Sequence, residues 1–289
     1  MATTPDAGAP GLTSRLADRV PAPALFVVGA TSMYLGAALA VGMFAVMPAP
    51  GVAWLRTVGA ALVLLAWRRP WRGQWDRRRL LLVAAFGTAL AAMNLSFYLA
   101  IERLPVGTAV AIEFLGPIVV AAAGSRSRRQ VTALVLAVGG IALLADVQWE
   151  GSPAGVGFGL LAAGFWALYI LLGSAVARRG AGVDSLAVGM ALGALAIAPI
   201  AAPAATPALA DAALLATGLS LGVLSNAVPY ALDQVVLRRV GPSTFALLIA
   251  LLPATAAVVG YLVLGQVLAA AEIAGIGLVI AAVAVRGAR

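Results

Sequence analysis

One acidic residue lies deep inside a long apolar run of this sequence. Glu113 is eight residues beyond Pro105, where the run begins, which corresponds to about 12 Å along a helix. A carboxylate at that depth in a membrane is costly, so it should face a cavity or a partner. We expect Glu113 to attract a substrate ammonium group or to carry a proton. The alternative is a structural ion pair with Arg56, which lies inside another apolar run.

An Asn-x3-Tyr element occurs twice, as Asn94 with Tyr98 and as Asn226 with Tyr230. A spacing of four residues places both side chains on one face of a helix. Each amide offers donors and an acceptor, so the two pairs could bind the carboxylate and the ammonium group of a zwitterion. The alternative is hydrogen bonding between helices without a role in binding.

Further aromatic residues fall within apolar runs, namely Tyr34, Trp166 and Tyr169. With Tyr98 and Tyr230, they could form the wall of a cavity and hold a cation over a ring face. Ordinary packing is the alternative for each of them. The predicted substrate-binding residues are therefore Tyr34, Asn94, Tyr98, Glu113, Trp166, Tyr169, Asn226 and Tyr230.

Pro117 and Pro253 lie at matching places in two apolar runs. Proline leaves one helical carbonyl without its donor and can kink a helix, so both residues are candidate gating positions. Proline without a gating role is the alternative, because membrane helices tolerate it. The pair Gly218 and Gly222 predicts close packing between helices.

The residue types that are missing exclude several chemistries. The chain has no Cys, no His and no Lys. This excludes disulfides, thiolate nucleophiles, Cys/His metal sites, a lysine Schiff base and a Walker phosphate loop. We expect no catalytic residue, no metal and no cofactor, and hence no enzyme. The net charge of +8 comes from arginine clusters between apolar runs, which indicates membrane topology rather than binding of nucleic acid.

The elements that position these residues are membrane helices. Of the 289 residues, 63% are hydrophobic and 10% are charged, whereas soluble domains carry about 25% charged residues. Each apolar run is long enough to cross a hydrocarbon core about 30 Å thick. The runs are residues 24–46, 51–67, 79–100, 105–124, 130–146, 153–176, 183–203, 211–234, 242–264 and 268–286. We therefore predict an all-α integral membrane protein with ten transmembrane helices in a lipid bilayer.

The arginines alternate between the connections of these helices. When the connections are assigned alternately to two sides, 17 of the 19 basic residues fall on one side. The opposite side has Arg103 beside the acidic residues Glu102, Asp146, Glu150 and Asp211. Because basic residues stay on the cytoplasmic side, both termini are predicted to be cytoplasmic in a bacterial inner membrane. Residues 1–23 are polar and rich in Pro and Ala, which predicts a disordered cytoplasmic tail.

The two halves of the sequence resemble each other. Besides the Asn-x3-Tyr elements, Arg103, Pro117 and Gly124 match Arg239, Pro253 and Gly260 at a constant offset of 136. We predict two five-helix repeats, residues 24–146 and 153–286. Because five is odd, the repeats enter the membrane from opposite faces, as in many secondary transporters, and a substrate site belongs between them. The alternative is coincidence among residues that are common in apolar sequence.

The stretch NLSFYLAIERLPVGTAVAIEFLGPIVVAAAGSRSRR, residues 94–129, contains an EFLGP element followed by a GSRR-like loop. With the second half, it resembles the EamA family of the drug/metabolite transporter superfamily, in particular threonine/homoserine exporters and related amino acid exporters. The resemblance implies efflux of amino acids or related metabolites through a central cavity between two halves. The resemblance predicts the general function, transport, more specifically than it predicts the transported compound.

Several functions compete on this evidence. The favoured one is a secondary transporter that exports a small metabolite, best a neutral amino acid, by alternating access, with Glu113 as a candidate for proton coupling. An exporter of drugs or lipophilic cations would use the same carboxylate and aromatic residues. A membrane receptor or a structural protein is a weaker alternative, since neither needs two inverted halves.

Overall fold

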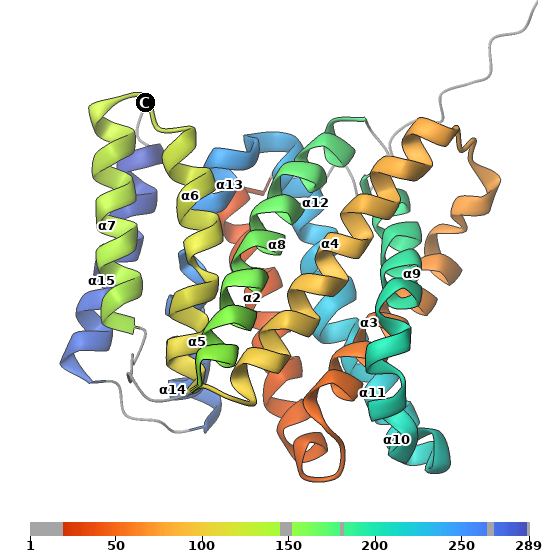
Figure 1. Ribbon diagram of the computed structural model, residues 1–289. Helices are drawn as coiled ribbons and strands as arrows, with labels where there is room; N and C mark the ends of the chain where they lie inside the picture. The colour runs from red at the N-terminus through yellow and green to blue at the C-terminus, as the bar shows by residue number, and fades with distance from the viewer. Residues whose placement is uncertain (1–19, 145–151, 180–181, 265–268, 288–289) are drawn as a thin grey trace, which may run out of the picture.

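The computed structural model describes residues 20–144, 152–179, 182–264 and 269–287. All regular structure in these ranges is helical, and the helices stand side by side as one bundle (Figure 1). The predicted tail, residues 1–23, lies outside the described residues as far as position 19. The first helix in the described part of the chain begins at Ala22, two residues earlier than predicted.

The first part of the chain runs through α2 (Ala22–Ala40), η1 (Val41–Ala45), α3 (Ala49–Arg68), η2 (Pro70–Arg72), α4 (Arg77–Ile101), α5 (Val106–Glu113), α6 (Leu115–Ala123) and α7 (Arg128–Leu144). The second part runs through α8 (Pro153–Arg178), α9 (Gly182–Ala201), η3 (Pro203–Ala205), α10 (Thr206–Ala210), α11 (Ala212–Gly222), η4 (Val223–Ala227), α12 (Val228–Val240), α13 (Pro242–Leu248), α14 (Leu251–Leu264) and α15 (Ala270–Gly287).

Seven helical segments in the described ranges are long and apolar enough to cross a membrane. They are Ala49–Arg68, Arg77–Ile101, Val106–Ala123, Pro153–Arg178, Gly182–Ala201, Ala212–Val240 and Pro242–Val259, and Ala22–Gly36 is a shorter apolar helix. The other two predicted runs contain α7 and α15. The prediction of an all-α membrane protein is thus confirmed.

The arginine-rich connections gather at one end of the bundle. In Figure 1 the α3–α4, α6–α7 and α12–α13 connections and the C-terminal end of α8 all lie at the upper end, while the α4–α5 connection lies at the lower end. Side-chain caps begin two of the long helices: Asp76 accepts a hydrogen bond from the Arg79 amide (2.6 Å), and Ser152 accepts one from the Gly155 amide (3.1 Å).

Helices of the two parts approach each other closely where glycine removes the side chain. A Cβ atom built on Gly222 of α11 would lie 2.2 Å from the carbonyl oxygen of Arg56 in α3, so only glycine permits this contact. A Cβ atom on Gly218 would lie 2.8 Å from the side chain of Leu55. The predicted packing role of this glycine pair is confirmed, and it brings the backbone of α11 against the turn that carries Arg56.

Two helical segments are interrupted near their middle. The first breaks at Phe114, between α5 and α6, and the second breaks between α13 and α14. Each break precedes a proline: Pro117 cannot donate to the carbonyl of Glu113, and Pro253 cannot donate to that of Ile249. Both prolines therefore explain a break, whereas their predicted role in gating stays a prediction.

Candidate functional site

A cavity of about 380 Å³ lies inside the bundle and receives side chains from both parts of the chain. Most of its wall is apolar and includes Met33, Phe97 and Leu252. Its polar and charged lining residues are Tyr34, Arg56, Asn94, Tyr98, Glu113, Tyr230 and Asp233. An apolar cavity with a few converging polar groups is the usual form of a small-molecule site.

Arg56 is the positively charged residue of this cavity. Its side chain is buried, with 6% of the residue exposed, and it donates hydrogen bonds to the Tyr98 hydroxyl and to Asn226 Oδ1, the latter over 3.0 Å. Its Nε–H is buried and has no partner within the described residues. Two of the five guanidinium N–H groups are thus satisfied within the described residues, and the Nε–H is enclosed, so a ligand would bind to the remaining N–H groups of Nη1 and Nη2.

Asn226 is held in place by an irregular turn. It lies in η4, a π-helical turn that follows from Pro229, because proline cannot donate to the carbonyl of Ser225 and the Val228 amide bonds to Val223 instead. Such π turns often occur at functional sites. Asn226 does not line the cavity itself, but it orients Arg56 from the second part of the chain.

Asn94, in the first part of the chain, makes the corresponding contact with the second part. Its Nδ2 donates to the Leu90 carbonyl over 2.9 Å and to the Tyr230 hydroxyl over 3.1 Å. The amide of each Asn-x3-Tyr element therefore connects to the tyrosine of the other element, directly from Asn94 and through Arg56 from Asn226.

Glu113 lies at the end of α5, at the helix break, and lines the cavity. It is buried, with 8% of the residue exposed. No ion pair joins it to Arg56, and within the described residues its carboxylate has no hydrogen-bond donor. The structural ion pair that was the alternative for Glu113 is therefore absent from this part of the chain.

Asp233 is a second acidic residue of the cavity, and it was not predicted from the sequence. It accepts a hydrogen bond of 2.8 Å from the Tyr169 hydroxyl. The view of Glu113 as the lone deep carboxylate is thus wrong. Asp233 falls three residues after Tyr230, on the same helical face, inside the predicted run 211–234. This spacing was the signal that could have identified it.

The predicted aromatic residues gather around the same cavity. Tyr34 and Trp166 line it, and Trp166 packs edge-on against Phe114 with ring centroids 5.1 Å apart. Tyr169 is not a lining residue, but it packs against Tyr230 with ring centroids 5.6 Å apart. The structure thus brings six predicted residues to the cavity wall and places Tyr169 and Asn226 directly behind it.

The cavity extends toward one end of the bundle. Its lining includes Phe44 of η1, Ile101 at the end of α4 and Val106 at the start of α5. The α4–α5 connection lies at the lower end of Figure 1. Phe26, near the start of α2, is buried and packs edge-on against Phe245 of α13, with ring centroids 5.7 Å apart. Phe26 also lines the cavity, so this aromatic pair forms part of its wall.

The charges in this cavity suit a ligand with charges of both signs. A guanidinium recognises a carboxylate in two-point geometry, and a carboxyl group at membrane depth binds an ammonium group or a proton. No cluster of metal-ligating residues occurs among the residues that the structure covers. The fold and this cavity define the chain as a membrane transporter for a small solute.

Comparison with known proteins agrees with this class. Residues 153–286 match the model of the EamA-like transporter family. The chain is 37% identical over 278 residues to the threonine/homoserine exporter RhtA of Salmonella typhimurium strain SL1344, covering 94% of this chain and 93% of that protein. It is also 37% identical over 263 residues to RhtA of Escherichia coli K12, covering 89% and 88%.

The chain therefore belongs to the EamA-like transporter family, which makes it a transporter and not an enzyme. A solved crystal structure has a similar fold, with a TM-score of 0.67 over 95% of this chain and 96% of its own chain at 16% identity.

Proposed function

We propose that this transporter exports amino acids, with small neutral zwitterions as its preferred substrates. The relatives named above are threonine/homoserine exporters that match most of the chain. The observation that carries the proposal is Arg56, which is fixed by Tyr98 and Asn226 and lines the same cavity as Glu113. Within the described residues, Arg56 keeps Nη N–H groups without a partner and the Glu113 carboxylate has no donor. Arg56 binds the α-carboxylate in this proposal, and an acidic residue binds the ammonium group.

Glu113 and Asp233 have different roles in this proposal. Asp233 is already an acceptor for Tyr169, whereas Glu113 has no partner in the described part of the chain. Glu113 is therefore the better ammonium site in the substrate-bound state, and it is the candidate proton site in the empty state. The apolar wall covers a short side chain, and Asn94 with Tyr230 supplies further hydrogen-bonding groups.

Transport by alternating access requires two halves that move against each other. We infer ten transmembrane segments in two inverted repeats, residues 24–146 and 153–286. Mirrored packing supports this arrangement: α3 packs on α11 as α9 packs on α4, and α4 packs on α8 as α12 packs on α2. The paired helix breaks at Phe114 and after Ile249 support it too. The site then lies between the repeats.

The proposed location is a bacterial inner membrane with both termini in the cytoplasm. Gathering of the arginine-rich connections at one end of the bundle supports this orientation. We propose that this is an outward-facing state, because the cavity lining extends to Ile101 and Val106 beside the α4–α5 connection, opposite the arginine-rich end.

The natural absence of Cys permits a direct test of this orientation. Single variants Glu102→Cys and Ser127→Cys, in opposite connections, are treated in intact cells with a membrane-impermeant maleimide. We expect labelling of Glu102→Cys in intact cells and of Ser127→Cys only after the membrane is opened. The reverse pattern would contradict the topology.

The substrate class is tested in proteoliposomes that contain the purified protein. Counterflow of labelled threonine, homoserine and a lipophilic cation is compared under identical conditions. We expect exchange of the amino acids and none of the cation. The aromatic wall and the excess of carboxyl groups over guanidinium groups in the cavity favour cation export as the second candidate. Transport of the cation without amino acid exchange would establish that candidate instead.

A further inference from the structure

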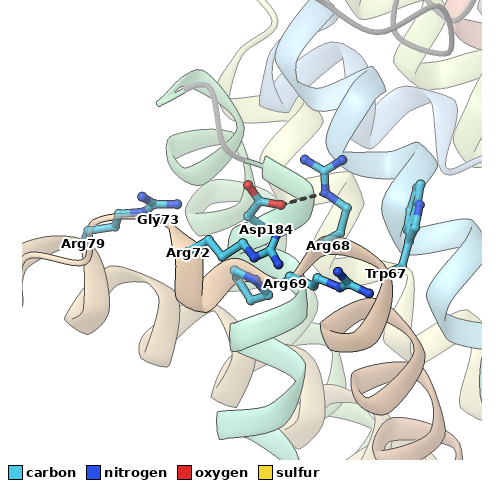
Figure 2. Close-up of a pocket in the computed structure, with 8 residues that line it drawn as sticks. Trp67, Arg68, Arg69, Arg72, Gly73, Arg79 and Asp184 are labelled. Atoms are coloured by element: carbon cyan, nitrogen blue, oxygen red, sulfur yellow. Dashed lines mark hydrogen bonds and ion pairs between the residues drawn. The ribbon is translucent and has the colours of Figure 1, made fainter. Parts of the chain in front are cut away.

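A second pocket, of about 530 Å³, lies outside the transport cavity, where α3 connects to α4 beside the start of α9. Its charged lining residues are Arg68, Arg69, Arg72, Arg79 and Asp184. Figure 2 shows Asp184 between Arg68 and Arg72, with Arg69 toward Trp67 and Arg79 at the opposite end. The α3–α4 connection, which carries most of these arginines, lies at the arginine-rich end of the bundle (Figure 1).

Internal contacts neutralise only part of this charge. Arg68 forms an ion pair of 2.7 Å with Asp184. Arg79 stacks over the Trp75 ring at 3.9 Å and donates to the Gln74 carbonyl over 2.9 Å. The guanidinium groups of Arg69 and Arg72 have no hydrogen bond or ion pair within the described residues. The pocket therefore carries an excess of positive charge.

The backbone fixes this arrangement. Arg69 adopts the left-handed conformation, with φ of 49° and ψ of 54°, and its amide bonds to the Leu65 carbonyl, which ends α3. A residue other than glycine rarely adopts this conformation, so a turn built on it has one defined geometry. The short turn η2 follows directly and holds Arg72 beside the end of α3.

Exposed tryptophans accompany the arginines. Trp67 and Trp71 are each 63% exposed, and they lie at the point where an apolar helix reaches the end of the bundle. Tryptophan prefers this level of a bilayer, where lipid headgroups meet the acyl chains. Trp67 lies beside the arginines of the pocket, with the Arg68 guanidinium carbon 5.5 Å from its ring centroid. This arrangement is suited to a lipid, because the indole contacts the chains while guanidinium groups of the pocket bind the phosphate.

We propose that this pocket binds the phosphate group of an anionic phospholipid at the arginine-rich face of the membrane. Guanidinium groups match phosphate oxygens in geometry and charge, and basic pockets beside membrane helices bind such headgroups. Arg69 and Arg72 contact the phosphate, while Arg68 remains paired with Asp184. A free phosphate ion has the same chemistry but gains nothing from Trp67 and Trp71.

The test uses the purified full-length protein in neutral detergent. Binding of short-chain phosphatidylglycerol, short-chain phosphatidylcholine and inorganic phosphate is measured by tryptophan fluorescence and by native mass spectrometry. We expect preference for phosphatidylglycerol, and a loss of roughly tenfold or more in its affinity for Arg69→Gln/Arg72→Gln. The matched control Arg126→Gln/Arg128→Gln removes two exposed arginines from another connection of the same face and should stay within about twofold of the parent.

Equal affinity for the two lipids would overturn the proposal, as would an equal loss in both double variants. Binding of inorganic phosphate as tight as that of phosphatidylglycerol would assign the pocket to a free anion and overturn the lipid as its occupant. The single variant Arg72→Gln serves if the double variant accumulates poorly, because Arg69 then keeps its turn. It should lose a smaller but measurable part of the affinity, and an unchanged affinity would count against the proposal.

Discussion

The two broken helices share a backbone device but differ in the residue that the break presents. Pro117 follows Glu113 by four residues, and Pro253 follows Ile249 by the same spacing. Glu113 and Ile249 both line the transport cavity, yet the side chain of Glu113 is a carboxylic acid and that of Ile249 is a hydrocarbon. The break itself is therefore a feature of the scaffold, while charge at the break occurs in the first half alone.

The two Asn-x3-Tyr elements also share a sequence pattern but differ in their contacts. Asn94 bonds directly to Tyr230, whereas Asn226 reaches Tyr98 through the guanidinium of Arg56. The second half supplies Asp233 instead of an arginine. Both parts of the chain thus contribute to the cavity, and their charged side chains give it one positive and two acidic groups. Recognition of a zwitterion would depend on these charged residues.

The largest expected effect comes from the arginine of this asymmetric set. Arg56→Gln removes the group proposed to bind the α-carboxylate, and it leaves Asn226 and Tyr98 without their charged partner. Loss of charge-assisted hydrogen bonds should lower amino acid counterflow by about 10- to 100-fold. The measurement is the initial rate per reconstituted protein. Arg103→Gln, which breaks an exposed ion pair of 3.2 Å with Glu102, is the control and should change little.

An unaltered rate in Arg56→Gln would remove the carboxylate site from the cavity. Poor accumulation of this variant would leave the question to Arg56→Lys, which keeps the charge but cannot supply a fork of donors. We expect Arg56→Lys to transport at an intermediate rate.

The sequence predicted the helical membrane fold and much of the cavity for physical reasons. Apolar runs of membrane-crossing length and a costly acid at membrane depth are visible without coordinates, so the runs and Glu113 were predicted. The role of Arg56 was not predicted from the sequence, because its partners Tyr98 and Asn226 lie 42 and 170 residues away in the chain. The bond from Tyr169 to Asp233 is equally non-local, and Asp233 was hidden by its place near the end of a predicted run.

A second prediction compares the two break residues directly. Glu113→Gln keeps the shape and removes the charge, and it should lower transport by about tenfold while flattening its dependence on pH. Ile249→Leu, at the matching position of the other half, should change transport by less than about twofold, because it conserves volume and carries no charge. Counterflow rates from pH 5.5 to 8.5 provide the measurement. Normal rates and normal pH dependence in Glu113→Gln would show that its charge has no role in transport.

The smallest expected effect concerns the prolines that shape both breaks. Pro117→Ala supplies an N–H that can bond to the Glu113 carbonyl, and Pro253→Ala does the same for Ile249. Each variant should change thermal stability by a similar small amount, on the order of 1 kcal/mol, because the local rearrangement is alike. Transport should differ: Pro117→Ala re-aims the side chain at a charged position and should slow counterflow by about threefold, whereas Pro253→Ala moves a hydrocarbon and should leave it nearly unchanged. Equal losses in both variants would mean that the breaks act as paired hinges, so that the motion of the helices, and not the placement of Glu113, is what the prolines provide.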